Sequence, residues 1–398
     1  MKNTWRFAGR ELDYLREVID TGFGSGTSGG MNNRFERAFA DAVGARWAVT
    51  FNSGTSTLHA GLDAMGVGPG DEVITTPLTV ISNLDVILAQ NAVPVFADID
   101  ARTFNIDPDQ VAALITPRTK AIMPVSLYGL SCDLDPLMAL AEAHGIMVLN
   151  DAAQAYGAEY KGRRIAEIAH VTSYSLENSK HITTGDGGIV VTNDEALATH
   201  IRKFGSLGYA AMTSGDGRIR LNKEVFQDPN YRRHDVYAHN YRMPEVAAAL
   251  GLAQTERMDH FVGLRQRIAS MYLEVMAGCD YLVPQTVPDG YLSGWWCVAC
   301  TYERDDVSWQ DFRRKYVEFG GDGIYAAWAL LYDETLYASG AWRRRCPQVY
   351  DACPDERPHC PNAETVQPKL MQFVNNYGSP EEAAPKVEAL EKTIAWFG

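Results

Sequence analysis

Residues 173–188 read Ser-Tyr-Ser-Leu-Glu-Asn-Ser-Lys-His-Ile-Thr-Thr-Gly-Asp-Gly-Gly, with Lys180 between an extended run and a glycine-rich turn. The flanking apolar runs, Val171–Ser175 and Gly188–Thr192, predict two short strands. Most lysines are solvated surface residues, but a lysine among Ser, Asn, Thr and Gly at a strand end is a candidate for a covalent bond to a carbonyl compound. That chemistry needs a neutral amine and therefore a lowered pKa. Ser175 adds a hydroxyl that suits a phosphate group.

Outward from this stretch, short apolar runs alternate with helical patterns. The expected strands are 46–51, 72–76, 93–97, 121–125 and 146–149, and the expected helices are 55–65, 80–89 and 135–143. This alternation is typical of an α/β fold, with a mostly parallel sheet covered by helices on both faces. After about residue 244 the pattern changes, and 245–276 reads as one long helix. We therefore expect a large domain over 1–245, and the linking helix with a smaller C-terminal α/β domain over 246–398.

Charge and composition exclude several classes of partner. The chain has 398 residues and a formal net charge of −14, which argues against nucleic acid or an anionic membrane as a partner. No stretch approaches the roughly 18 consecutive apolar residues of a membrane span. Seven scattered cysteines and the lack of an apolar run at the start favour a cytoplasmic protein with free thiols.

Three further segments carry polar residues where a ligand would bind. Residues 52–56 (Asn-Ser-Gly-Thr-Ser) follow a predicted strand and begin a helix, so they suit a phosphate, although Ser53 or Thr55 could simply cap that helix. Asp151 follows the apolar run 146–149, and a carboxylate there could pair with a protonated pyridine nitrogen or cap the next segment. Residues 239–245 precede the long helix and could be no more than its starting loop.

Other motifs favour a structural interpretation. Residues 24–29 match G-x-G-x-x-G, but this motif follows a helix, whereas a dinucleotide site requires a preceding strand. Cys346, Cys353 and Cys360 lack the close pairing of zinc ligands, and Cys297 and Cys300 lie in a predicted strand, so no metal is expected. Trp295, Trp296 and Trp328 could line a sugar site, but core packing is the favoured interpretation.

In four segments the chain resembles the DegT/DnrJ/EryC1/StrS family of sugar aminotransferases, which are fold type I enzymes that use pyridoxal 5'-phosphate (PLP). The motifs are Ser-Gly-Thr at 53–55, Asp-Ala-Ala-Gln-Ala at 151–155, Ser-Lys-His-Ile-Thr-Thr-Gly-Asp-Gly-Gly at 179–188 and Asn-Tyr-Arg-Met at 240–243. The resemblance covers nearly the whole chain and is strongest from about 30 to 260. It implies the α/β fold described above and a cofactor held covalently by one lysine.

The resemblance also implies individual roles. Lys180 would bind PLP and move protons at the reacting carbon, and Asp151 would pair with the pyridine nitrogen. Gln154 would contact the side of the ring that carries the phenolic oxygen. The phosphate would be held by Gly54, Thr55 and Ser175, and by Asn240 of the neighbouring subunit. This arrangement implies a homodimer with shared active sites, and it places the Gly22–Gly30 loop near one of them.

The chain departs from the family pattern at several places that tend to face substrate. Val80 stands where an aromatic residue usually stacks on the PLP ring, so contact there would be apolar only. Ser126 stands where the family commonly has histidine, and Glu177 occupies a position that is often His or Gln. The segment Gly-Ile-Tyr-Ala-Ala-Trp at 323–328 replaces a frequent Gly-Ile-His-Tyr-Pro. These changes are compatible with an unusual acceptor.

The resemblance implies transamination in two steps. Glutamate or glutamine would displace Lys180 and leave as a keto acid, and a keto-sugar or keto-cyclitol would then accept the amino group. The alternatives are a sugar dehydratase, in which histidine typically replaces the lysine, and an inactive PLP-binding or regulatory protein. Lys180 argues against the first, and the intact set of Lys180, Asp151 and Gln154 argues against the second. The acceptor and the donor remain open.

Overall fold

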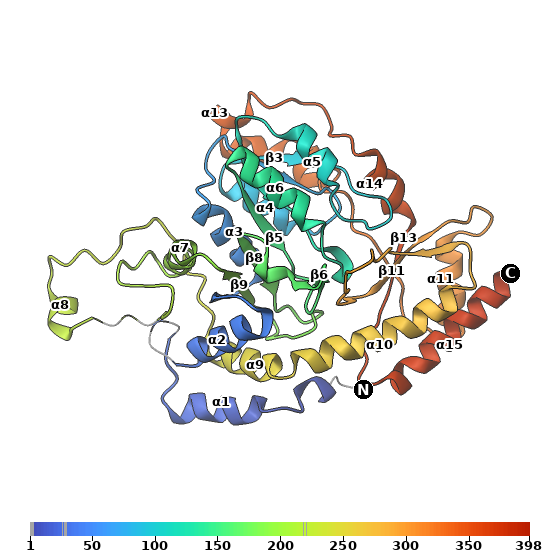
Figure 1. Cartoon of the computed structure of the whole chain (residues 1–398), viewed down its shortest axis with the longest axis horizontal. Coiled ribbons are helices and arrows are strands. Elements are labelled where there is room, and N and C mark those ends of the chain that lie inside the picture. Colours follow the sequence, from blue (N-terminus) through green and yellow to red (C-terminus); the bar gives the residue numbers. More distant parts are fainter. Residues whose placement is uncertain (1–3, 26, 28–29, 218, 220) are drawn as a thin grey trace.

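Seven strands form one sheet through the larger part of the molecule (Figure 1). The computed structural model describes residues 4–398 except 26, 28–29, 218 and 220. In sheet order the strands are β1 (Trp47–Phe51), β9 (Gly188–Thr192), β8 (Val171–Ser175), β5 (Met147–Asp151), β4 (Thr119–Met123), β2 (Glu72–Thr75) and β3 (Val93–Phe96). Only β9 runs antiparallel to its neighbours within this sheet. The predicted mostly parallel sheet is therefore confirmed.

Helices cover both faces of this sheet, because alternate residues of each strand point to opposite sides. In β9, Ile189 and Val191 join the apolar core on one face, and Val190 joins the core on the other. The first face carries α1 (Glu11–Asp20), α2 (Met31–Val43), α5 (Pro108–Leu114), α6 (Leu134–His144) and α9 (Glu245–Thr255). The second face carries α3 (Gly54–Ala64), α4 (Ser82–Ala89) and α7 (Glu195–Gly205).

The prediction of a single long helix over 245–276 is wrong. Helix α9 ends at Thr255, and a separate helix, α10 (Met258–Met276), begins after Arg257. Neither Pro nor Gly lies at the break, so local sequence does not explain it. Tertiary contacts of the residues at the break explain it instead. Glu256 accepts a hydrogen bond from the hydroxyl of Tyr14, and the Arg257 guanidinium donates to the backbone oxygen of Arg6 at 3.1 Å.

A second, four-stranded antiparallel sheet lies in the C-terminal part. Its order is β10 (Leu282–Pro284), β11 (Val298–Tyr302), β13 (Leu370–Phe373) and β12 (Tyr325–Ala326). The C-terminal half of α10, α11 (Trp309–Glu318) and α15 (Pro380–Phe397) share an apolar core with this sheet. Figure 1 shows α10 and α15 side by side along one edge of the molecule.

The chain between β12 and β13 returns to the large sheet. Ala327, Leu331 and Trp342 share a buried cluster with Leu78 and Phe96, which follow β2 and end β3. This stretch holds α12 (Thr335–Ala338), α13 (Pro347–Tyr350) and α14 (Pro361–Val366). The other short elements are α8 (Lys223–Gln227), the pair β6 (Glu159–Tyr160) and β7 (Arg163–Arg164), and 3-10 turns at Thr4–Phe7, Leu127–Gly129, Ile165–Glu167, Ala341–Arg345 and Gln367–Lys369.

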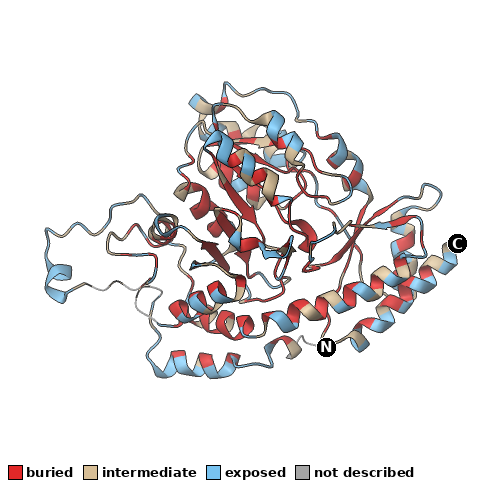
Figure 2. Ribbon diagram, viewed as in Figure 1, coloured by how far each residue is buried: buried red, intermediate tan, exposed pale blue. Residues whose placement is uncertain are grey.

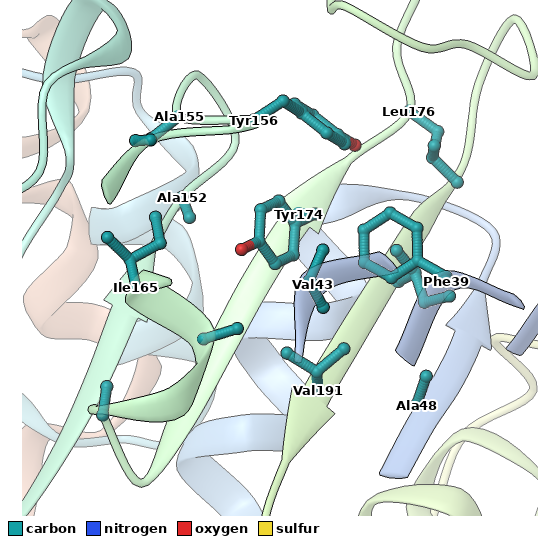
Figure 3. Close-up of a cluster of buried hydrophobic side chains, with 14 of the residues drawn as sticks. Phe39, Val43, Ala48, Ala152, Ala155, Tyr156, Ile165, Tyr174, Leu176 and Val191 are labelled. Carbon is teal, nitrogen blue, oxygen red and sulfur yellow. The ribbon is translucent and has the colours of Figure 1, made fainter. Parts of the chain in front are cut away.

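Aromatic packing under the sheet supports the strand that leads to the lysine. Figure 3 shows Phe39, Tyr156 and Tyr174 together; the ring centroids of Phe39 and Tyr174 are 5.2 Å apart, and those of Tyr156 and Tyr174 are 5.1 Å apart. The buried hydroxyl of Tyr156 donates to the backbone oxygen of Ser175 at 2.7 Å. The end of β8 is therefore held from below by both packing and a hydrogen bond.

The segment between α7 and α9 differs from the rest. Figures 1 and 2 show it as an extended excursion that carries α8 away from the sheet, and most of its described residues are exposed or intermediate. Tyr237 is 85% exposed, which is unusual for a large aromatic side chain. Elsewhere, no described helix has the length and apolar character to cross a membrane.

Candidate active site

A cavity of about 290 Å³ opens where β5 and β8 end. Seven of the eight residues expected from the sequence line it: Gly54, Thr55, Val80, Asp151, Gln154, Ser175 and Lys180. The exception is Asn240. Ligands of open α/β sheets bind beyond the carboxyl ends of the strands, and this cavity has that position.

One end of the cavity is suited to a phosphate. Helix α3 begins there, and Ser53 caps it by accepting a hydrogen bond from the Ser56 amide at 3.1 Å. A Cβ on Gly54 would lie 2.8 Å from the Cβ of Ser175, so only glycine allows the helix start to approach β8 this closely. The hydroxyls of Thr55 and Ser82 lie 2.8 Å apart in the same wall. The amides at the start of α3 and the hydroxyls of Thr55, Ser82 and Ser175 thus surround this end of the cavity.

Ser82 and Thr79 also lie in this wall and were not expected from the sequence. The sequence predicted that helix α4 begins at residue 80, whereas the helix begins at Ser82. Ser82 could have been found from its place in the first turn of the helix that follows the second strand. The sheet brings that helix, α4, onto the same face as α3. Val80 lies in the wall, and its apolar contact with a cofactor ring remains a prediction.

Asp151 is the last residue of β5 and is 3% exposed. Its Oδ1 accepts a hydrogen bond from the Ala153 amide at 3.0 Å. Burial raises the pKa of this carboxyl above its ordinary value, whereas the Ala153 amide and the nearby Lys180 amine lower it. A buried carboxylate of this kind is stabilised by a cationic partner in the cavity, such as a protonated ring nitrogen.

Gln154 is oriented by the backbone of a neighbouring turn. Its Oε1 accepts a hydrogen bond from the Tyr128 amide at 2.7 Å, and the side chain is 4% exposed. The oxygen must face that N–H donor, so the amide NH2 is the group left to donate toward the cavity. Gln154 therefore presents a donor to a ligand that carries an oxygen.

Lys180 is 9% exposed and lies in the turn between β8 and β9. Its Nζ stands 4.8 Å from the centroid of the Trp296 ring. Burial is the largest cause that lowers the pKa of this amine below its ordinary value; Asp151 and Glu177 raise the pKa, and Arg265 lowers it. The surroundings of Lys180 therefore shift the amine toward its neutral, nucleophilic form, which is the direction expected from the sequence.

The three tryptophans divide between the core and the cavity. Trp295 joins the buried core of the second sheet, as favoured. Trp296 and Trp328 line the cavity, although Trp296 also packs against a buried apolar cluster, so core packing alone does not describe these two. Trp296 is anchored by its indole nitrogen, which donates to the Ser179 backbone oxygen at 3.1 Å. Trp328 is 41% exposed and leaves much of its ring available to a ligand.

The remaining candidate motifs lie apart from the cavity. Asn240 is exposed and forms an isolated bridge with Ser206, so its expected contact with a neighbouring subunit remains a prediction. Residues 26, 28 and 29 of the G-x-G-x-x-G stretch fall outside the described residues, and the Gly24 amide donates to Glu245 at 2.8 Å. The seven cysteines are free thiols, and within the described ranges no three His, Cys, Asp or Glu residues are grouped as metal ligands would be.

Comparisons with known proteins agree with this geometry. The model of the DegT/DnrJ/EryC1/StrS aminotransferase family matches residues 7–367. The chain is 42% identical over 273 residues to GDP-perosamine synthase of Caulobacter vibrioides, which is 68% of each protein. It is 39% identical over 285 residues to the spore coat polysaccharide biosynthesis protein SpsC of Bacillus subtilis, which is 72% of this chain and 71% of that protein.

Solved structures have the same fold. The aminotransferase from Psychrobacter cryohalolentis superposes with a TM-score of 0.83 at 28% identity, over 97% of this chain and 96% of that chain. A 3-amino-5-hydroxybenzoic acid synthase superposes with a TM-score of 0.81, also at 28% identity and over 97% and 96% of the two chains. Both the family match and these superpositions extend across the large sheet and most of the C-terminal part.

Proposed function

The chain belongs to the DegT/DnrJ/EryC1/StrS aminotransferase family, and from that premise we propose that it transfers an amino group from glutamate or glutamine to a nucleotide-linked keto-sugar. As a member of this family it is a PLP-dependent aminotransferase of amino-sugar biosynthesis. The observation that carries the proposal is the convergence of Lys180, Asp151 and Gln154 on one cavity. The relative named GDP-perosamine synthase supports a nucleotide-linked acceptor.

The residues of the cavity fit PLP. The start of α3 with Gly54, Thr55 and Ser175 would hold the phosphate, because it offers amides and hydroxyls where a side chain on residue 54 would block the space. Asp151 would hold a proton on the ring nitrogen, and the Gln154 amide would donate to a ring oxygen. When bound, PLP supplies an electron sink for the carbon that exchanges its amino group.

Lys180 would act first as the covalent anchor and then as the proton carrier. With the cofactor bound and the lysine released, its Nζ would be free to accept a proton at the reacting carbon and to return it elsewhere. The lowered pKa of Lys180 favours the neutral form that accepts the proton. Trp296 limits where Nζ can move, since the ring lies 4.8 Å away and is fixed by its own hydrogen bond.

A homodimer with shared active sites is the second part of the proposal. Asn240 lies on the exposed excursion between α7 and α9, outside the cavity of its own chain. An extended segment with an exposed aromatic residue such as Tyr237 is suited to cover a second copy of the chain. In that arrangement Asn240 would complete the phosphate site of the partner.

The test of the function begins with the visible spectrum of the protein purified with PLP. We expect an absorption band from the lysine-bound cofactor that bleaches on addition of L-glutamate, and no such band in Lys180→Ala. The bleached protein should then aminate a nucleotide-linked keto-sugar more readily than a keto-inositol. If neither glutamate nor glutamine bleaches the band, the proposed amino donor is wrong. If the protein aminates keto-inositol more readily than the keto-sugar, the proposed acceptor is wrong.

A further inference from the structure

Two arginines from distant parts of the chain meet at the backbone of the lysine turn. Arg6, in the first 3-10 turn, donates to the backbone oxygens of Asn178 and Lys180, each at 2.6 Å. Arg265, in α10, donates to the backbone oxygens of Ser179 at 2.8 Å and Lys180 at 3.1 Å. The Lys180 carbonyl thus accepts from both guanidinium groups, and the turn is held on the side away from the cavity.

These two guanidinium groups are buried without a directly paired carboxylate. Arg6 is 1% exposed and Arg265 is 3% exposed, and neither forms an ion pair with a described carboxylate, although the charge of Glu177 raises the pKa of Arg6. Burial lowers the pKa of Arg6 to about 10 and that of Arg265 to about 9, so both remain charged at neutral pH. Arg202 offers a contrast, because it is equally buried but pairs with Glu36 at 2.9 Å. Burial of an unpaired charge is costly and suggests a use for it.

We propose that Arg6 and Arg265 are positioning residues for Lys180: they fix the lysine turn by its carbonyl oxygens, and their unpaired charges hold the lysine amine in its neutral, nucleophilic form. This proposal rests on Lys180 being the residue that binds the cofactor. Neither arginine touches the cavity, so each acts through the turn and through its electric field.

The other charged groups around Lys180 do not provide the same effect. Asp151 at the end of β5 and Glu177 in the same turn both favour the protonated amine, and Arg265 opposes them. The remaining ionisable groups near the turn are Cys297 before β11, Asp186 in the cavity wall and the adjacent His181, whose pKa is lowered by burial and by the charges of Arg265, Lys180 and Arg6. Two acidic residues near the amine raise its pKa, and burial is the largest cause that lowers it. Arg265 adds a positive charge that acts in the same direction as burial.

The experiment compares Arg265→Gln with Arg265→Lys in the holoenzyme. Gln removes the charge, and Lys keeps the charge but loses the forked hydrogen bonds. The readout is the pH at which the visible band of the lysine-bound cofactor changes form, together with the pH dependence of cofactor capture after the cofactor has been removed. Loss of a nearby positive charge should raise both midpoints by about one pH unit, which slows capture at neutral pH about tenfold. Arg265→Lys should keep both midpoints near those of the unmodified protein.

A matched variant separates charge from stability. Arg202→Gln also disturbs a buried arginine, but the hydrogen bonds of Arg202 go to Glu36, Ala48 and Ser214 and not to the lysine turn, so it should lower the melting temperature without moving either midpoint. The pair Arg6→Gln and Arg6→Lys repeats the comparison if the Arg265 variants fail to fold. Equal midpoints in the Gln and Lys variants would overturn the proposal. Absence of the cofactor band in the unmodified protein would instead contradict the proposed function.

Discussion

The two walls of the cavity differ in how they are built. The wall that suits PLP is made by strand ends and helix starts of the large sheet, and its polar residues are deeply buried: Asp151 is 3% exposed and Gln154 is 4% exposed. The other wall is formed by Trp296 and Trp328 from the C-terminal part, and Trp328 is 41% exposed. A cofactor that stays bound favours a rigid wall, whereas two substrates that enter and leave in turn require an open one.

The largest expected effect tests whether the cofactor wall is completed by a second chain. Lys180→Ala and Asn240→Asp should each be inactive, because the first lacks the anchor and the second opposes a phosphate with a negative charge. When the two variants are co-expressed, half of the dimers are mixed and each mixed dimer has one intact site. Activity should therefore recover to about a quarter of the normal level.

The control for this experiment combines Lys180→Ala with Asp151→Asn. Both residues belong to the cavity of one chain, so no mixed dimer of these variants has an intact site. Recovery of activity in the control, or its failure with Asn240→Asp, would contradict the shared site.

A smaller effect is expected from closing the space at the start of α3. In Gly54→Ala the new Cβ would meet the Cβ of Ser175 at 2.8 Å, so the helix start or β8 must shift. We expect the dissociation constant for PLP to rise about 10-fold to 100-fold, measured by spectroscopic titration. Gly278→Ala is the control, because Gly278 is exposed after α10 and a Cβ there would lie 4.0 Å from its nearest neighbour, the Val275 backbone oxygen. Unchanged affinity in Gly54→Ala would show that the phosphate lies elsewhere.

The smallest expected effect lies on the open wall. Trp328→Ala should raise the KM for the keto-sugar about tenfold, because a ring that packs on the acceptor is lost, and should leave the rate of bleaching by glutamate unchanged. Trp396→Ala removes another exposed tryptophan, on α15, and should change neither value. If bleaching by glutamate slows as much as amination of the keto-sugar, Trp328 supports the cofactor instead. The two walls would then not differ in the ligand that they bind.

The cofactor wall was largely predictable because each of its motifs follows a recognisable strand. Seven of the eight expected site residues line the cavity, and the strands Val171–Ser175 and Gly188–Thr192 have the predicted bounds. Ser82 was missed because its neighbour, Thr55, is 27 positions away in the sequence and meets it only through the sheet. Trp296 and Trp328 were assigned to the core because an apolar residue in isolation carries no sign of which side it faces.

The sequence by itself determined the alternation of strands and helices and the family, and it singled out the lysine, aspartate and glutamine proposed to bind the cofactor. The alternation, the lysine and the aspartate follow from local patterns, namely periodic apolar residues and polar residues at strand ends, whereas the glutamine follows from the family resemblance. Only the tertiary structure decided where α9 ends, which tryptophans face the cavity, and that Arg6 and Arg265 meet on the backbone of Lys180. Residues that are 174 and 85 positions from the lysine are brought to it by packing, and a local pattern contains no information about such distances.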